Sequence, residues 1–253
     1  MVLDWLWKVL GWNMWANLKH RSYEPELLDA DTIDSQVLSK NLKEIAFINK
    51  WLGGDHVSIK GIRKIIGPKK IKNLRFADIG CGSGDTLQLI AKWGSKRKID
   101  VILTGIDLKK ECIDLAKETI TSASPVLIQS DYRDVDLTTI KPDIIHASLF
   151  LHHLTDESII EFLKNAVKHA TIGVVINDLH RHPLAYYSIK WITRLFPSSY
   201  LVRNDAPLSV WRAFSRKEIE KFCLKAQVTE YSITWHWAFR WLLVIKTNSV
   251  EQK

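Results

Sequence analysis

The stretch from Phe76 to Asp85 constrains the fold of this chain more than any other part of its 253 residues. It reads FADIGCGSGD: a short apolar run ends on Asp78, and glycines follow at alternate positions, namely Gly80, Gly82 and Gly84. Glycine adopts backbone conformations that other residues avoid, and without a Cβ it lets a ligand approach the main chain closely. The pattern therefore predicts a buried strand, a tight turn beside a ligand, and a helix.

The spacing of these glycines separates two kinds of ligand. A dinucleotide-binding loop reads G-x-G-x-x-G and presents a helix N-terminus to a pyrophosphate. This loop reads G-x-G-x-G and begins two residues after Asp78. A carboxylate at that place would repel a pyrophosphate, but it suits a ligand that carries an ammonium group and a sulfonium. The loop therefore points to S-adenosylmethionine.

Strand-like and helix-like patterns alternate along the rest of the chain. Strands are expected at residues 74–79, 101–106, 126–129, 143–148 and 173–177. This alternation predicts an α/β fold with a parallel sheet and helices on both faces. Two final runs rich in β-formers, 228–234 and 238–246, are expected to pair as an antiparallel hairpin at the sheet edge.

Two further acids stand at predicted strand ends. Asp107 ends the second strand, where a carboxylate can accept hydrogen bonds from both ribose hydroxyls of an adenosyl ligand. The alternative for Asp107, a cap at the start of the next helix, is compatible with that role. Asp131 follows the third strand and can accept from the adenine amine, while the N–H of the next residue donates to a ring nitrogen. Its alternative is a solvent-exposed loop acid.

With these motifs and the run DIIHASLFLHHL over residues 143–154, the chain resembles the class I S-adenosylmethionine-dependent methyltransferases. The resemblance spans about residues 74–246 and implies a Rossmann-like, seven-stranded, mostly parallel sheet with an antiparallel last strand. The LHHL run resembles a small-molecule and quinone branch, and segments 23–29, 49–54 and 177–186 resemble a bacterial group that often accompanies polyketide-type biosynthetic genes. The cofactor-binding residues it implies are Asp78, Gly80, Cys81, Gly82, Gly84, Asp107, Leu108, Asp131, Tyr132 and Ser148.

The chain is expected to divide into a helical N-terminal extension or cap, residues 1–70, and a methyltransferase domain, residues 71–253. Within the latter, residues 180–211 form an aromatic-rich insertion longer than an ordinary loop. Such an insertion beside a site predicts a lid over a flat or lipophilic acceptor. A helical pair that merely extends the core is the alternative.

Histidines are the candidates for a catalytic base, since imidazole titrates near neutral pH. Four of them follow the fourth and fifth predicted strands, and we prefer His153 and His180 over His152 and His182. For each of these histidines, the alternative is a purely structural role in a hydrogen bond. No metal is expected, because no carboxylate–histidine pattern of a known metal motif accompanies these histidines.

Composition and charge indicate which kinds of binding partner and which compartment to expect for this chain. The net charge is +8, but Lys and Arg are scattered and no nucleic-acid motif accompanies them, so no nucleic-acid partner is expected. Three cysteines match no disulfide or zinc framework, which favours a reducing, cytoplasmic compartment. No stretch of the chain approaches the roughly 20 apolar residues that span a bilayer, so no transmembrane helix is expected. Residues 1–18 hold four tryptophans. They are expected either to contact a membrane interface peripherally or to pack on the domain.

These features predict transfer of a methyl group to a small-molecule acceptor, with O-methylation of a phenolic or polyketide-like compound as the leading hypothesis. C-methylation of a lipid-soluble quinone precursor is the second hypothesis. A cofactor-binding protein without catalytic activity is a third, of another class. Methylation of RNA or protein is disfavoured, because the Asn/Asp-Pro-Pro-Tyr/Phe motif is absent after the fourth strand, where Ser148-Leu149-Phe150 stands.

Overall fold

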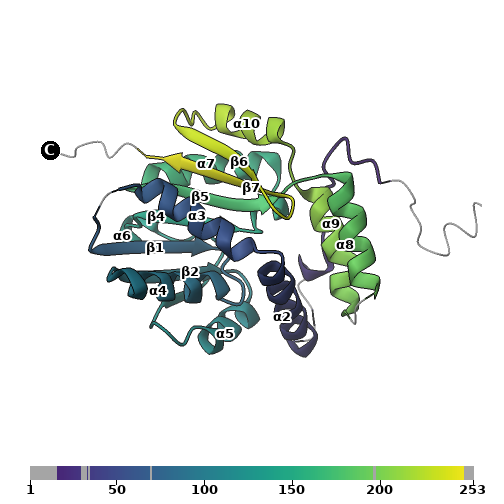
Figure 1. Ribbon diagram of the computed structural model, residues 1–253, viewed down its shortest axis with the longest axis horizontal. Helices are drawn as coiled ribbons and strands as arrows, with labels where there is room; N and C mark the ends of the chain where they lie inside the picture. Colours follow the sequence, from purple (N-terminus) through teal and green to yellow (C-terminus); the bar gives the residue numbers. More distant parts are fainter. Residues whose placement is uncertain (1–15, 30–32, 34, 69, 196–197, 248–253) are drawn as a thin grey trace, which may run out of the picture.

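The computed structural model describes residues 16–29, 33, 35–68, 70–195 and 198–247, and its elements surround one seven-stranded sheet (Figure 1). The strands are β1 (Asn73–Ile79), β2 (Asp100–Asp107), β3 (Val126–Gln129), β4 (Ile144–Ser148), β5 (Gly173–Leu179), β6 (Tyr231–His236) and β7 (Arg240–Lys246). The helices are η1 (Leu27–Asp29), α2 (Ser35–Trp51), α3 (Gly54–Ile66), α4 (Asp85–Arg97), α5 (Lys110–Thr119), α6 (Leu137–Ile140), η2 (Leu151–His153), α7 (Asp156–His169), α8 (Pro183–Leu195), α9 (Tyr200–Arg212) and α10 (Arg216–Lys225).

The strand order is β3-β2-β1-β4-β5-β7-β6. The first five strands pair in parallel, whereas β7 lies antiparallel to both β5 and β6. The predicted Rossmann-like sheet and its final hairpin are therefore confirmed. Because the order reverses between β1 and β4, the carboxyl ends of these two strands flank the crevice in which open α/β sheets bind ligands.

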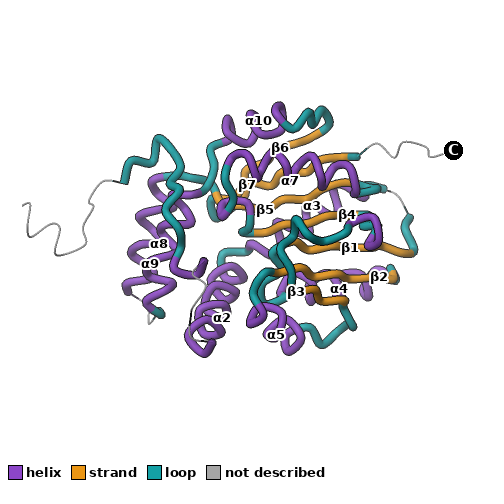
Figure 2. The backbone as a smooth tube through the Cα atoms, turned by 180° about the vertical axis from the view of Figure 1, so that it is seen from behind, coloured by secondary structure: helices purple, strands orange, loops and turns teal. Residues whose placement is uncertain are grey.

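Helices cover both faces of the sheet (Figure 2). Residues of β5 alternate between the two cores, since successive strand side chains point to opposite faces. Val174 and Ile176 pack with α7 and α10, and Val175 packs with α3 and α4. Although the sequence assigns α3 to an N-terminal extension, it lies on the sheet itself, where a Cβ at Gly61 would stand 2.5 Å from Val175.

Helices α2, α8 and α9 lie beyond the carboxyl ends of the parallel strands, at the right of Figure 1. The expected insertion contains α8 and α9, which pair with each other, and α9 also contacts α2 and η1. These elements place side chains from residues 27–51 and from residues 183–212 over the strand tips.

No helix in the described part of the chain combines the length and the apolar character needed to cross a membrane. The tryptophans at positions 5, 7, 12 and 15 lie outside the described residues, so their two predicted placements stay predictions.

Candidate active site

A cavity of about 790 Å³ opens at the carboxyl ends of β1, β2 and β4. This volume lies within the range of small-molecule sites, about 300–1,000 Å³. Nine of the ten predicted cofactor-binding residues line the cavity: Asp78, Gly80, Cys81, Gly82, Asp107, Leu108, Asp131, Tyr132 and Ser148. The tenth, Gly84, does not line it but precedes α4 as its N-cap.

The three loop glycines all have left-handed backbone angles, with φ of 68°, 51° and 78° at Gly80, Gly82 and Gly84. Such angles strain any residue with a Cβ. At Gly80 a Cβ would stand 2.4 Å from the ring of Phe150, whereas at Gly82 it would meet no atom within 4 Å. Gly82 is therefore the glycine at which the backbone leaves room for a ligand.

Asp78, at the end of β1, is held by a buried network. It is 2% exposed, and its Oδ1 lies 2.7 Å from Nδ1 of His146, whose Nε2 lies 2.9 Å from the hydroxyl of Ser58. His146 is the neighbour of Asp78 across the β1–β4 ladder. Burial raises the pKa of Asp78. The sequence did not predict this role for His146, because this residue lies inside an otherwise apolar strand pattern.

The other two acids are also bound to the backbone around them. Asp107 accepts from the N–H of Gly82 at 2.9 Å and from the N–H of Lys109 at 3.0 Å, so one side chain joins the glycine loop to the start of α5. Each carboxylate oxygen retains capacity for a further donor. Asp131 is bonded through both oxygens to the guanidinium of Arg133, which lowers the pKa of Asp131.

The structure separates the two predicted catalytic histidines. His153 lines the cavity, and its Nδ1 lies 3.0 Å from Oδ1 of Asp29. His180 is not among the lining residues; its ring lies 4.7 Å from that of Trp241, and burial lowers its pKa to about 4. His152, the residue passed over, also lines the cavity, with Nδ1 2.7 Å from Oδ1 of Asp178.

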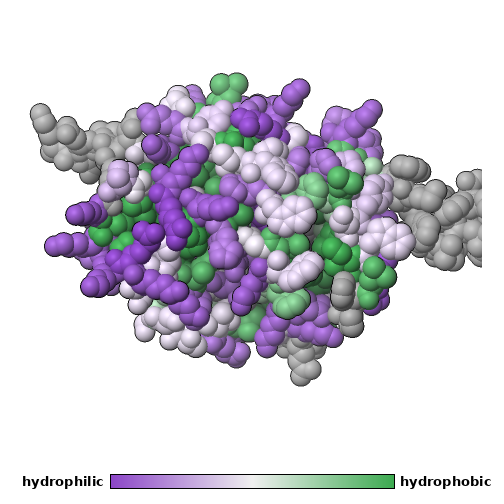
Figure 3. Space-filling view, in the orientation of Figure 1, coloured by the Kyte–Doolittle hydropathy of each residue, from purple (hydrophilic) through white to green (hydrophobic). Residues whose placement is uncertain are grey.

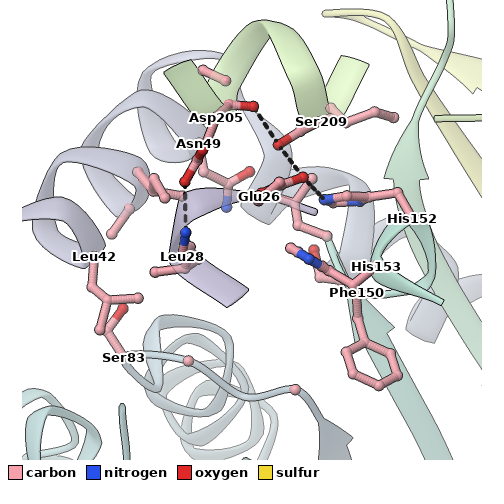
Figure 4. A pocket seen from close by; sticks show the side chains of 18 of the residues that line it. Glu26, Leu28, Leu42, Asn49, Ser83, Phe150, His152, His153, Asp205 and Ser209 are labelled. Atoms are coloured by element: carbon pink, nitrogen blue, oxygen red, sulfur yellow. Dashed lines mark hydrogen bonds and ion pairs between the residues drawn. The ribbon is translucent and has the colours of Figure 1, made fainter. Parts of the chain in front are cut away.

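Glu26 is a cavity residue that the sequence did not single out (Figure 4). It is 4% exposed, accepts a hydrogen bond of 2.9 Å from Ser209, and lies 3.8 Å from Nε2 of His152. Burial raises its pKa to about 7. The only sequence signal was its place in segment 23–29, one of the runs that carry the family resemblance, since no periodic pattern or strand end marks it.

The comparisons with known proteins agree with this geometry. Residues 76–173 match the family model of a methyltransferase domain. The matched stretch covers less than half of the chain and includes the glycine loop, Asp107 and Asp131. The chain is similar to the Bacillus subtilis protein YqeM, whose name describes it as a methyltransferase, at 27% identity over 146 residues, which cover 56% of this chain and 54% of YqeM. The match thus spans about half the length of that relative.

Two solved structures share the fold of the methyltransferase domain and its flanking helices. The plantazolicin methyltransferase BpumL in complex with SAH is 17% identical, with a TM-score of 0.66, and the match covers 87% of this chain and 93% of that one. The magnesium protoporphyrin IX methyltransferase of Synechocystis with bound SAM is 12% identical, with a TM-score of 0.51 and coverage of 87% and 88%. At such identities the likeness concerns the fold.

Buried arginines attach the segment before η1 to the methyltransferase domain. Arg181 and Arg212 are both buried, and their guanidinium groups donate to backbone oxygens. Arg212 donates to the backbone oxygens of His152 and His153 at 3.0 and 2.8 Å. Arg181 donates to the backbone oxygens of Leu18 and Ala213.

Replacing Gly82 by alanine is expected to weaken S-adenosylmethionine binding about tenfold and to lower the free energy of unfolding by about 1–2 kcal/mol, the cost of a left-handed angle at a residue with a Cβ. The new methyl group would point into the open cavity. Calorimetric titration and urea denaturation measure the two effects. Unchanged affinity would show that the ligand does not approach the loop at Gly82.

Proposed function

We propose that this chain transfers a methyl group from S-adenosylmethionine to an oxygen of a small, largely apolar acceptor, such as a phenolic or polyketide-like compound. The observation that carries the proposal is the extension of the cavity beyond the glycine loop into an apolar region. That region is lined from α2, α8, α9 and the β6–β7 hairpin by Leu42, Ile45, Ile48, Ala185, Ile189, Ile192, Val202, Val210 and Phe239. One cavity thus offers a donor end and an acceptor end.

Methyl transfer is an in-line displacement at an already activated carbon, so holding donor and acceptor in line supplies much of the rate. A phenolic oxygen has a pKa near 10 and gains from a base that takes its proton. His153 is our candidate, because it lines the cavity and its Nδ1 is held by Asp29. His180 is not among the residues that line the cavity, so we assign it no role in the mechanism.

The names of two similar structures, which specify plantazolicin and magnesium protoporphyrin IX, support a small-molecule acceptor. C-methylation of a lipid-soluble quinone precursor is the second candidate, favoured by the apolar surface near the cavity. Figure 3 shows hydrophobic side chains over α8, where Leu184, Trp191 and Leu195 are exposed. Trp51 and Trp237 are exposed and also line the cavity.

The proposal is tested by incubating the full chain with S-adenosylmethionine and a panel of phenols, polyketide-like compounds and quinone precursors. Mass spectrometry should detect a product heavier by one methylene, and fragmentation locates the new methyl group on oxygen or carbon. Calorimetry should show binding of the donor and of SAH. Binding of neither by folded protein would refute the proposal, and donor binding without any product would favour the non-catalytic alternative.

A further inference from the structure

Glu26, His152 and His153 come together on the wall of the cavity, although Glu26 precedes η1 and the histidines belong to η2. One carboxylate oxygen and one nitrogen from each ring all lie within 4.8 Å of one another. The ligand atoms around a tetrahedral zinc ion are about 3.4 Å apart, from metal–ligand distances of about 2.1 Å. The 3.8 Å between Nε2 of His152 and Glu26 is close to that separation.

Each histidine is oriented by a carboxylate of its own. Nδ1 of His152 pairs with Asp178 at 2.7 Å, and Nδ1 of His153 pairs with Asp29 at 3.0 Å. Metal-binding histidines almost always donate their second ring nitrogen to a carboxylate, a carbonyl or water, which fixes the tautomer and aims the free lone pair. Two such pairs side by side, next to a buried acid, therefore have the outer shell of a metal site.

The charge around the cluster favours a cation. Glu26, Asp178 and Asp205 are buried, and Asp29 lies beside them. Arg212 makes the ion-pair contacts to this group, at 3.9 Å to Glu26 and 3.3 Å to Asp29. A cation bound among these carboxyl groups would offset part of a charge that is costly to bury.

We propose that Glu26, His152 and His153 bind one divalent transition-metal ion, whose remaining coordination positions face the cavity. Two imidazoles and one carboxylate suit zinc or iron(II) better than magnesium, and three protein ligands leave an open position. Metal binding itself does not depend on the proposed function; only the use of the open position by an acceptor oxygen rests on it. In this arrangement His153 is a ligand and not a base, contrary to the expectation that no metal is present.

The test is metal binding by the full chain after treatment with a chelator. Titration with Zn²⁺ and Co²⁺, followed by calorimetry and by the visible absorption of bound Co²⁺, should show one ion per chain. Glu26→Gln should abolish this binding. Asp29→Asn, which keeps the three ligands but weakens the partner of His153 and the contact with Arg212, should weaken it by about 10–100-fold. His169→Gln, a half-buried histidine on α7 that does not line the cavity, is the control and should bind like the parent chain.

Donor binding provides the fold check, since the glycine loop and Asp107 are separate from the three ligands. A Glu26→Gln variant with normal donor affinity and no metal supports the site. A parent chain that binds donor but neither Zn²⁺ nor Co²⁺ overturns the inference and leaves the proposed function intact, as does equal metal binding by Glu26→Gln. A preference for Mg²⁺ would contradict the assignment to a transition metal. Failure to bind the donor would refute the proposed function, whatever the metal result.

Discussion

Replacing Asp107 by alanine is expected to lower the affinity for S-adenosylmethionine by about 10²- to 10⁴-fold. If Asp107 accepts from both ribose hydroxyls, as the sequence predicts, its removal costs two hydrogen bonds to a charged acceptor, worth about 1.5–3 kcal/mol each. About 1.4 kcal/mol equals a factor of ten in affinity. Asp107 also accepts from the N–H groups of Gly82 and Lys109. Its removal therefore loosens the glycine loop as well as the ribose end of the site.

Calorimetric titration of the purified variant with S-adenosylmethionine measures this loss. The matched control is Asp100→Ala, an exposed acid at the opposite end of β2, which should bind the donor as the parent chain does. Asp107→Asn should fall between the two, because an amide oxygen still accepts but carries no charge. Equal affinity of Asp107→Ala and Asp100→Ala would refute the ribose-binding role.

Replacing Arg212 by methionine is expected to lower the free energy of unfolding by about 3–5 kcal/mol, the usual cost of removing one partner from a buried charged network. The guanidinium donates to the backbone oxygens of Glu24, His152 and His153 and pairs with Asp29. Methionine fills part of the space but leaves these acceptors without a donor. The segment before η1 should then separate from the domain early in unfolding.

Urea denaturation followed by tryptophan fluorescence gives the free energy. Arg203→Met is the control, since Arg203 is exposed on the same helix, α9, and its replacement should change stability by less than about 0.5 kcal/mol. Limited proteolysis should cut the Arg212→Met variant within residues 16–29 before the parent chain. A loss of stability no larger than that of Arg203→Met would show that this network does not hold the segment.

The sequence alone was sufficient to predict the sheet and a group of residues expected to bind the donor, nine of which line the cavity. Strand and helix periods are local properties, and residues 126–129 were predicted as a strand with the bounds that the structure has. The cofactor motifs could be found because each follows a strand directly, and the carboxyl ends of parallel strands meet at one edge. Asp78, Asp107 and Asp131 therefore reach one cavity although they are far apart in the chain.

Only the tertiary structure decided that Glu26 lies beside the histidines of η2. Glu26 meets His152 because Arg21 and Arg212 attach the segment before η1 to η2. Arg21 donates to the backbone oxygen of His152 and Arg212 to that of Glu24, across 131 and 188 positions of the chain. No periodicity records such contacts. The same physics separates His153 from His180: both follow a strand, but whether a side chain enters the cavity depends on how α8, α9 and the β6–β7 hairpin pack around it. Local sequence patterns determine where the glycine loop lies, whereas long-range packing determines which histidines line the cavity.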